Sequence, residues 1–365
     1  MELLPTALTF DDVLILPNYS EVLPTEVDTT TTLAPGLSLK IPLMSAAMDT
    51  VTELEMALKL AELGAMGILH KSCEIQQQVE WLKQVRAQVP NGYVGAATGV
   101  GAVGLERGLA LIDAGATVLV VDTAHGHSKA VLDQVRAFRK ARPSTYIIGG
   151  NVGTSDGAKA MIEAGASAVK VGIGPGAICT TRVVSGIGAP QLQAIIDCAA
   201  VCGPAKISLI ADGGIKTSGD ITKAIAAGAT AVMMGSMFAG TDEAPGEIIQ
   251  SGSGQLKLYR GMGSLSAMKK GSKDRYGQGG VIDSTKLVPE GVEGFVAYKG
   301  PVEGVLNQMV GGLRSGMGYV GAKTILELQK KSRFVQVSMA SLQESHPHSL
   351  SAIRSAPNYS VKGGQ

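Results

Sequence analysis

The segment Ala164-Gly165-Ala166-Ser167-Ala168-Val169-Lys170-Val171-Gly172-Ile173-Gly174 contains the pattern that decides the fold. Gly165 stands where a helix would end, and residues 168–171 form a short apolar run that glycines follow at once. Short continuous apolar runs are typical of strands that are buried on both faces. The segment therefore predicts the end of a helix, a buried strand and a Gly-rich loop.

The same pattern recurs along the chain. Gly64, Gly115 and Gly228 each stand between small or apolar residues, directly before an apolar run. Eight candidate strands result, at residues 41–46, 67–69, 94–97, 118–122, 146–150, 168–171, 209–212 and 231–234, and helical patterns fill the intervals, as at 53–63, 76–88, 129–141 and 191–202. This alternation predicts an α/β protein, a (β/α)8 TIM barrel. An open doubly wound sheet is the alternative, because barrel closure is not visible in a sequence.

Composition argues against several classes of protein. The chain has 32 Lys+Arg and 31 Asp+Glu, so it offers no positive field for nucleic acid or for an anionic membrane. A long uncharged stretch, residues 224–241, is interrupted by three glycines and does not resemble a membrane span. Residues 1–5 lack the features of a secretory signal, and four scattered cysteines cannot form a disulfide framework. We expect a soluble, cytoplasmic protein with no nucleic-acid or membrane partner.

Polar and Gly-rich residues follow the predicted strands, at the end where barrel enzymes build their active sites. Asp212-Gly213-Gly214 follows the seventh strand and Gly235-Ser236 the eighth. Backbone amides of these two loops commonly bind phosphate in barrels, and glycine allows the close approach. The sequence thus predicts an enzyme with a phosphorylated ligand, whose ribose hydroxyls Asp212 could bind.

A third loop, residues 172–182, carries the candidate nucleophile. Its glycines can turn amides or carbonyls inward to hold an anion or a cation, and Cys179 stands near its end. Amides that point at the sulfur would favour the thiolate. The other thiols, Cys73, Cys198 and Cys202, fit buried apolar positions.

Three further patterns leave alternatives open. Gly99-x-Gly101-x-x-Gly104, with Asp122 downstream, matches a dinucleotide-binding fingerprint. His125 and His127 could form a metal pair, although no third ligand is evident. The phosphate loops would suit a flavin mononucleotide equally well.

We expect residues 1–365 to form one catalytic domain. After the eighth strand, residues 251–300 are rich in Gly, Ser, Lys and Asp, which is typical of a mobile flap inserted in a barrel. Helical periodicity returns over residues 302–332, and residues 340–365 are predicted to form a C-terminal arm.

With these motifs the sequence closely resembles the IMP dehydrogenase family and its GMP reductase sister group. The resemblance covers nearly the whole chain, and Gly-Ile-Gly-Pro-Gly-x-x-Cys-Thr-Thr at residues 172–181 is its most specific part. Further matching stretches are residues 8–14, 45–51, 122–128, 149–152, 212–215, 259–264, 274–276 and 286–294. The resemblance implies a (β/α)8 fold, a homotetramer and NAD-dependent oxidation of IMP to XMP in guanine nucleotide biosynthesis.

The resemblance also implies residue roles. The catalytic group would be Cys179, which forms a covalent thioimidate, with Thr181, Arg275 and Tyr276, which assist its hydrolysis. Substrate would be bound by Met48, Asp212, Gly214, Gly235, Ser236, Tyr259, Met262, Gly263 and Glu290, and NAD by Asp122, Thr123, Asn151 and Gly172. A monovalent cation, K⁺ in the family, would be held by Gly174, Gly176 and Cys179, with Glu344, Ser345 and His346 of a neighbouring subunit.

Two departures from the family pattern stand out. Position 177 is Ala where the family usually has Ser, which removes a hydroxyl from the expected phosphate site. The family also usually carries a tandem cystathionine-β-synthase-type (CBS) regulatory module, which is absent here at about residues 88–93. The short chain favours GMP reductase, which converts GMP to IMP with NADPH, whereas Arg275-Tyr276 and Glu290 favour the dehydrogenase. A catalytically silent nucleotide-binding barrel is the third alternative.

Overall fold

Eight parallel strands form a closed barrel. They are β4 (Leu43–Ser45), β5 (Met66–Leu69), β6 (Val94–Thr98), β7 (Val118–Asp122), β8 (Tyr146–Val152), β9 (Ala168–Val171), β10 (Ser208–Asp212) and β11 (Ala231–Met234), and β11 pairs with β4 to close the ring. The computed structural model describes residues 4–252, 254–350 and 356–359. The predicted barrel is confirmed, and the open sheet is excluded because both strands that would be its edges are paired.

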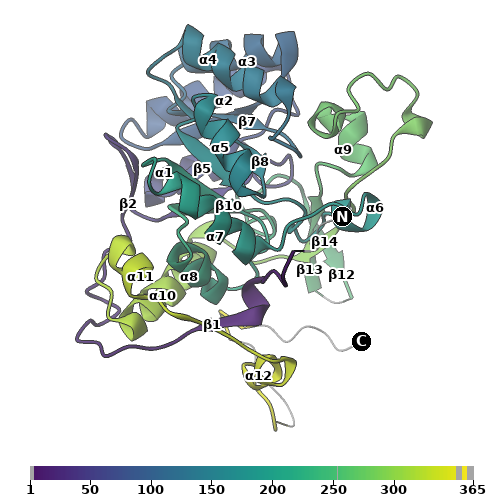
Figure 1. The fold of residues 1–365 in the computed structure, drawn as a ribbon. Coiled ribbons are helices and arrows are strands. Elements are labelled where there is room, and N and C mark those ends of the chain that lie inside the picture. The colour runs from purple at the N-terminus through teal and green to yellow at the C-terminus, as the bar shows by residue number, and fades with distance from the viewer. Residues whose placement is uncertain (1–3, 253, 351–355, 360–365) are drawn as a thin grey trace.

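Helices surround the barrel (Figure 1). They are α1 (Leu54–Leu63), α2 (Ile75–Gln88), α3 (Gly101–Asp113), α4 (Lys129–Ala141), α5 (Ser155–Glu163), α7 (Gln191–Cys202), α8 (Ser218–Ala226), α10 (Val302–Val320) and α11 (Ile325–Lys331). The glycines at the predicted helix stops, Gly64, Gly115, Gly165 and Gly228, have φ of 82°, 93°, 97° and 114°. These left-handed values favour glycine over any residue with a Cβ, which explains the recurring motif.

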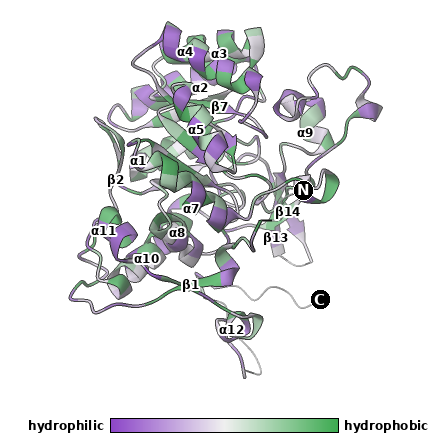
Figure 2. Cartoon of the chain, viewed as in Figure 1, coloured by the Kyte–Doolittle hydropathy of each residue, from purple (hydrophilic) through white to green (hydrophobic). Residues whose placement is uncertain are grey.

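Apolar side chains form two layers of core. One layer fills the space between strands and helices, as where Val131, Val135 and Phe138 of α4 turn inward. Peripheral helices accordingly carry both hydrophilic and hydrophobic residues (Figure 2). The second layer fills the barrel itself and includes Leu33 and Leu37 of a hairpin formed by β2 (Thr31–Ala34) and β3 (Leu37–Leu39). This hairpin covers the N-terminal end of the barrel, so access is left at the opposite, C-terminal end.

The segment after β11 leaves the barrel and then returns to it. It forms a three-stranded antiparallel sheet of β12 (Ile248–Ser251), β13 (Gly254–Arg260) and β14 (Glu293–Ala297). Between β13 and β14 lie α9 (Leu265–Lys269) and the 3-10 turns η2 (Ser272–Tyr276) and η3 (Ser284–Lys286). Figure 1 shows this insertion to the right of the barrel. The region predicted as a flap is thus anchored by a sheet, and its mobility stays a prediction.

A strand near each end of the described chain forms a two-stranded sheet. The strand β1 (Val13–Ile15), which follows the 3-10 turn η1 (Phe10–Asp12), pairs antiparallel with β15 (Phe334–Gln336). A short helix, α12 (Met339–Glu344), overlaps the start of the predicted C-terminal arm, and residues 351–355 and 360–365 of that arm lie outside the described residues. Within the described ranges, we find no helix with the length and hydropathy needed to span a bilayer.

Candidate active site

A cavity of about 350 Å³ opens at the C-terminal ends of the barrel strands. Eighteen of the predicted site residues line it: Met48, Asp122, Asn151, Gly172, Gly174, Gly176, Cys179, Thr181, Asp212, Gly214, Gly235, Ser236, Tyr259, Met262, Gly263, Arg275, Tyr276 and Glu290. They come from strand-end loops and from the insertion after β11. The structure therefore brings residues from both parts of the chain to one cavity of a size suited to a small ligand.

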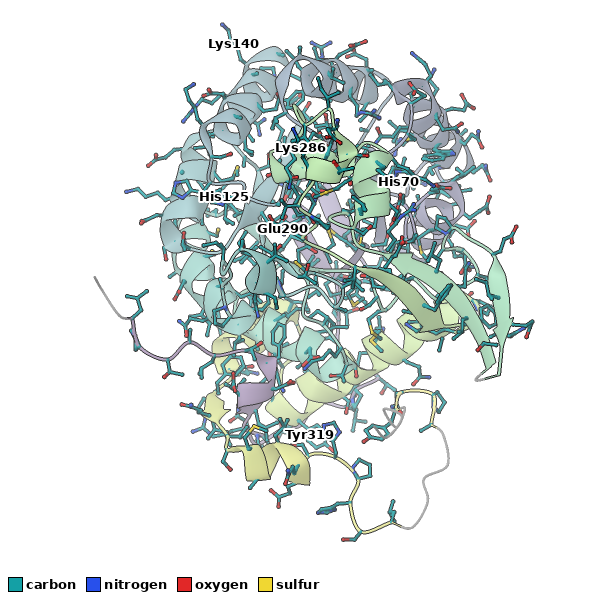
Figure 3. All side chains as sticks on the ribbon, turned by 90° about the vertical axis from the view of Figure 1, so that its right-hand side faces the viewer. His70, His125, Lys140, Lys286, Glu290 and Tyr319 are labelled. Carbon is teal, nitrogen blue, oxygen red and sulfur yellow. The ribbon has the colours of Figure 1, made fainter. Side chains whose placement is uncertain are left out.

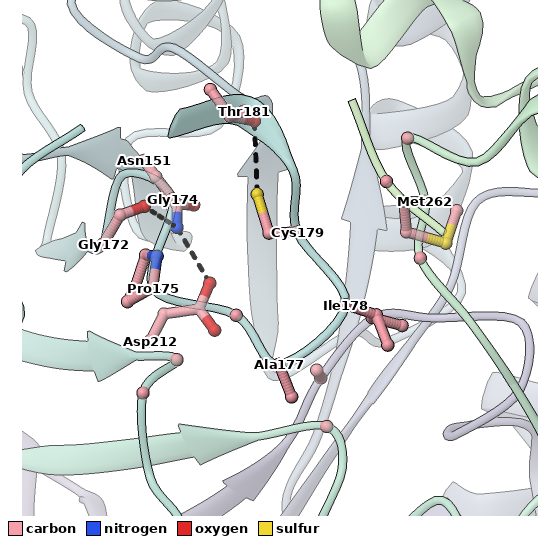
Figure 4. Close-up of a pocket in the computed structure, with 18 of the residues that line it drawn as sticks. Asn151, Gly172, Gly174, Pro175, Ala177, Ile178, Cys179, Thr181, Asp212 and Met262 are labelled. Atoms are coloured by element: carbon pink, nitrogen blue, oxygen red, sulfur yellow. Dashed lines mark hydrogen bonds between the residues drawn. The ribbon is translucent and has the colours of Figure 1, made fainter. Parts of the chain in front are cut away.

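Cys179 lies in the loop between β9 and the short helix α6 (Thr181–Val184). Its Sγ is 3.2 Å from the Oγ1 of Thr181 (Figure 4), and its amide donates to the carbonyl of Gly176. The residue is half-buried and lines the cavity. The thiol is therefore held by its own loop and remains open to a ligand.

The other three cysteines have different surroundings. Cys198 and Cys202 are buried on α7, and burial raises the pKa of their thiols to about 12 and about 11. Burial likewise raises the pKa of Cys73 to about 11. None of the three lines the cavity. Cys198 and Cys202 thus have the predicted buried positions, whereas Cys73 is only partly buried and lies beside Arg107. A thiol with so high a pKa is a poor nucleophile at neutral pH.

Lys170 forms the floor of the cavity and was not predicted as a site residue. Its side chain is 2% exposed, and its Nζ lies 2.5 Å from Asp212 Oδ2 and 3.0 Å from Asp122 Oδ1. It also donates to the side chain of Asn151, whose own amide donates to Asp212 (Figure 4). A buried charge must be paired to be tolerated. The ammonium thus ties together two carboxylates from β7 and β10 and an amide from β8.

The insertion after β11 supplies the Arg275 and Tyr276 side chains. The guanidinium of Arg275 pairs with Asp122, and the amide of Ala124 donates to the Arg275 carbonyl. Burial lowers the pKa of Arg275, while the adjacent Tyr276 hydroxyl opposes that shift. Burial also raises the pKa of Tyr276, which therefore keeps its proton at neutral pH.

Close backbone contacts join Tyr276 to the Cys179 loop. A Cβ at Gly263 would stand 2.7 Å from the Tyr276 hydroxyl, so glycine is needed there. The amide of Glu290 donates to the Gly263 carbonyl, and the amide of Thr180 donates to the Glu290 carbonyl. Glu290 lies near the middle of the face seen in Figure 3. Residues 263 and 290 thus connect the insertion to the nucleophile loop.

The predicted phosphate loops, which follow β10 and β11, lie side by side in the cavity wall. The amide of Gly213 donates to the carbonyl of Met233, which links the ends of β10 and β11. A Cβ at Gly235 would stand 2.7 Å from the Tyr259 hydroxyl, so these two residues are in close contact. Burial raises the pKa of Tyr259, which is therefore a neutral donor at this wall.

Four predicted residues do not line the cavity. The Oγ1 of Thr123 donates to the Gly150 carbonyl, so this buried side chain ties the β7 loop to β8. Glu344, Ser345 and His346 are exposed at the end of α12. Ser345 Oγ donates to the Ser341 carbonyl, and the His346 ring contacts the Tyr359 hydroxyl. Within one chain this segment makes no contribution to the cavity.

Neither the glycine motif nor the histidine pair forms its own site in the described part of the chain. The glycine motif at residues 99–104 lies where β6 of the barrel is followed by α3. A Cβ at Gly104 would stand 2.5 Å from the Gly99 carbonyl. This glycine serves helix packing, and the motif opens no separate dinucleotide domain. The His125 and His127 rings lie 6.5 Å apart, and among the described residues no cluster of three or more His, Cys, Asp or Glu forms a metal site.

Comparison with known proteins identifies the family. The sequence model described as "IMP dehydrogenase / GMP reductase domain" matches residues 7–348. Inosine-5′-monophosphate dehydrogenases from Streptococcus pyogenes and Aquifex aeolicus (strain VF5) are each 41% identical over 97% of this chain, covering 97% and 98% of those proteins. The one from Cryptosporidium parvum is 46% identical, over 97% of this chain and 98% of that protein.

The alignments also bear on the missing module. The Streptococcus alignment spans 480 positions, so it includes more than a hundred that this chain of 365 residues does not have. The Cryptosporidium alignment spans only 394. In the structure, α2 ends at Gln88 and β6 begins at Val94, with a short direct connection. By its sequence and by the strand-end cavity built around Cys179, this chain belongs to the IMP dehydrogenase/GMP reductase family and lacks the CBS module.

Proposed function

We propose that this enzyme oxidises IMP to XMP with NAD⁺ as its co-substrate. One observation carries the proposal: the half-buried Cys179 thiol lies in a cavity between two glycine-rich strand-end loops and the Asp122–Lys170–Asp212 cluster. The relatives named IMP dehydrogenase support the choice of reaction. The cavity thus offers a nucleophile, a phosphate wall and a polar wall for the co-substrate.

Substrate binding is assigned to the loops after β10 and β11, to Met48, and to residues beside the sheet that anchors the insertion. Gly214, Gly235 and Ser236 would hold the phosphate, while Asp212 and Tyr259 would bind the ribose. Met48, Met262, Gly263 and Glu290 would surround the base. The contact between Tyr259 and Gly235 and the hydrogen bonds from Lys170 and Asn151 to Asp212 support this assignment, because they fix the donors and acceptors before a ligand arrives.

The reaction begins at C2 of the hypoxanthine ring. The Cys179 thiolate bonds to C2, and the hydrogen of that carbon leaves with its electron pair to NAD⁺, which is released as NADH. Water then attacks C2 of the thioimidate and displaces the thiolate, which yields XMP and a proton. Thr181, whose Oγ1 lies beside Sγ, is placed to orient the thiol.

The co-substrate and the flap would use Asp122 in turn. Asp122, Asn151 and Gly172 line the polar wall that we assign to the nicotinamide half of NAD⁺, with Thr123 behind them as a tether. In this structure Arg275 pairs with Asp122. The nicotinamide and Arg275 would compete for that carboxylate, so departure of NADH would allow the part of the insertion 251–300 around Arg275 and Tyr276 to close as a mobile flap and bring these two side chains to the thioimidate.

Activation of water is assigned to Arg275. An arginine ordinarily stays protonated; burial lowers the pKa of Arg275 toward the neutral guanidine that a base requires, while the Asp122 carboxylate and the Tyr276 hydroxyl favour the charged form. Tyr276, which forms a hydrogen bond with Arg275, would orient it. Thr181 and Glu290 would complete a proton path out of the cavity.

The loop after β9 also fits a monovalent cation, K⁺. In the described part of the chain, the carbonyls of Gly174 and Cys179 accept no hydrogen bond, and the Gly176 carbonyl accepts one from Cys179. Such oxygens suit a weakly hydrated cation. The bound ion would hold the loop rigid, and Glu344, Ser345 and His346 of a neighbouring subunit in a homotetramer would complete its shell.

A spectrophotometric assay tests the proposal. The enzyme is mixed with IMP and NAD⁺ in K⁺ buffer, and NADH formation is followed by absorbance, with GMP and NADPH as the matched pair. We expect NADH only with the first pair. Consumption of NADPH with GMP, and no signal with IMP, would instead identify a GMP reductase. Retention of flavin by the purified protein would indicate a flavoenzyme, and bound IMP without any turnover would indicate a silent barrel.

A further inference from the structure

Lys299 lies two residues beyond β14, outside the residues assigned above, and reaches the phosphate loop. Its Nζ donates to the carbonyls of Ser236 and Met237, both at 2.9 Å, and its own amide donates to the Gly240 carbonyl at 2.9 Å. A Cβ at Gly240 would collide with the carbonyl of Ala297. The end of β14 is therefore pressed against the back of the 235–240 segment.

The two carbonyls bound by Lys299 have no other donor among the described residues. The amides of Phe238 and Ala239 both donate to the Gly235 carbonyl, which closes a tight turn. This leaves the Ser236 and Met237 carbonyls outside the turn's own hydrogen bonds. Unpaired backbone carbonyls cost free energy when they lose water, so the ammonium stabilises this form of the loop.

A trans peptide unit is planar and points its carbonyl and its N–H in opposite directions. By binding the Ser236 carbonyl, Lys299 therefore fixes the direction of the Met237 amide. That amide and the Ser236 amide donate to no protein acceptor in the described ranges. Two donors are thus free at the loop that we assign to the phosphate.

Lys299 is an exposed residue, but its ammonium is held against the two carbonyls. Loss of hydration lowers the pKa of Lys299 to about 8. A lysine of β13, Lys257, donates to the carbonyls of Thr241 and Ala244 at 2.9 and 2.5 Å. Lys257 and Lys299, which lies just beyond β14, thus both bind carbonyls of the 236–244 segment.

We infer that Lys299 is a positioning residue that holds the 235–237 loop in the conformation that binds the substrate phosphate. It acts through the loop's backbone, since it donates to carbonyls on the loop. The inference rests on the proposed function for the identity of the substrate, but the hydrogen bonds that carry it hold for any phosphorylated ligand. It also makes the sheet that anchors the flap a part of the phosphate site.

The test compares Lys299→Met and Lys299→Arg with Lys140→Met as a matched control. Lys140 is an exposed lysine on α4 that projects from the edge of the molecule (Figure 3). Loss of two hydrogen bonds from a charged donor should raise KM for IMP about tenfold in Lys299→Met. We expect kcat, KM for NAD⁺ and Tm to change little, and Lys299→Arg to restore most of the affinity. Titration calorimetry with inosine, which has no phosphate, should show equal binding to all variants.

Two results would overturn the inference. One is an unchanged KM for IMP in Lys299→Met. The other is an equal loss of affinity for IMP and inosine together with a lower Tm, which would show a structural role alone. If the wild-type enzyme does not turn over IMP, the proposed function fails separately. In that case the inference is tested by the binding of inorganic phosphate, measured by phosphorus NMR. Weaker phosphate binding to Lys299→Met than to the wild type would support the inference, and equal binding would refute it.

Discussion

The guanidinium of Arg275 pairs with the carboxylate of Asp122, although the two residues are 153 positions apart in the sequence. Asp122 ends barrel strand β7, whereas Arg275 belongs to the insertion after β11. The same carboxylate also lies 3.0 Å from the Nζ of Lys170. Arg275 of the flap therefore contacts the same carboxylate as Lys170 at the bottom of the cavity. The first prediction concerns this arginine.

Arg275→Ala should slow hydrolysis far more than hydride transfer. The expected loss is about a hundredfold or more in the hydrolytic step, the size of effect that a removed general base produces. Stopped-flow absorbance should show a burst of one NADH per active site, followed by slow turnover. Arg136→Ala, an exposed arginine on α4, is the matched control and should behave like the wild type. Equal slowing of both phases would contradict the role assigned to the flap.

The hydrolytic step should accelerate as pH rises. Burial lowers the pKa of Arg275, so the fraction of neutral guanidine grows with increasing pH, and only that form accepts a proton from water. The steady-state rate is to be measured between about pH 6 and pH 9 under conditions where hydrolysis limits turnover. The residual rate of Arg275→Gln should lose this rise. A variant with the wild-type pH profile would show that the base lies elsewhere.

Cys179 should be the residue that carries the covalent nucleotide. Mass spectrometry after mixing with IMP and NAD⁺ should detect an adduct on the peptide that contains Cys179, and Cys179→Ala should show none. The matched control is Cys198→Ala, which removes a buried thiol whose pKa is raised to about 12. It should keep the adduct at the wild-type level. An adduct on Cys73 or Cys202 would refute the assignment.

Ala177→Ser should tighten IMP binding. Ala177 lines the cavity in the loop that carries Cys179 (Figure 4), and a hydroxyl there would add a donor beside the expected phosphate. One added hydrogen bond to a charged group predicts a gain of about threefold to tenfold in affinity. Calorimetry measures it, and Ala177→Val controls for the added volume. Equal affinities for the serine and alanine forms would place the phosphate away from residue 177.

Sequence patterns within short windows predicted much of the fold. The strand 118–122 and the helix 129–141 have the predicted bounds, because an apolar run and a helical period are both visible within a short window. The strand predicted at 41–46 is shorter, at Leu43–Ser45, and the one predicted at 146–150 is longer, at Tyr146–Val152. Strand ends depend on neighbouring strands, which a single window does not contain. The pairing of β1 with β15 was missed for the same reason.

The site was predicted through motifs, and the groups without a motif were missed. Lys170 stands inside an apolar strand, and its partner Asp212 is 42 residues away, so no spacing marks the pair. One signal was present: a lysine in a strand buried on both faces requires a buried partner. The contact of Lys299 with the phosphate loop, over 63 residues, has no sequence signature at all.

The direct connection between α2 and β6 has a consequence for protein engineering. A connection from a helix to the next barrel strand lies at the N-terminal end of the barrel, opposite the end that carries the active-site cavity. A foreign sensor domain inserted between Gln88 and Val94 would therefore lie away from the cavity and leave ligand entry open. We expect this connection to be a suitable place to add new allosteric control.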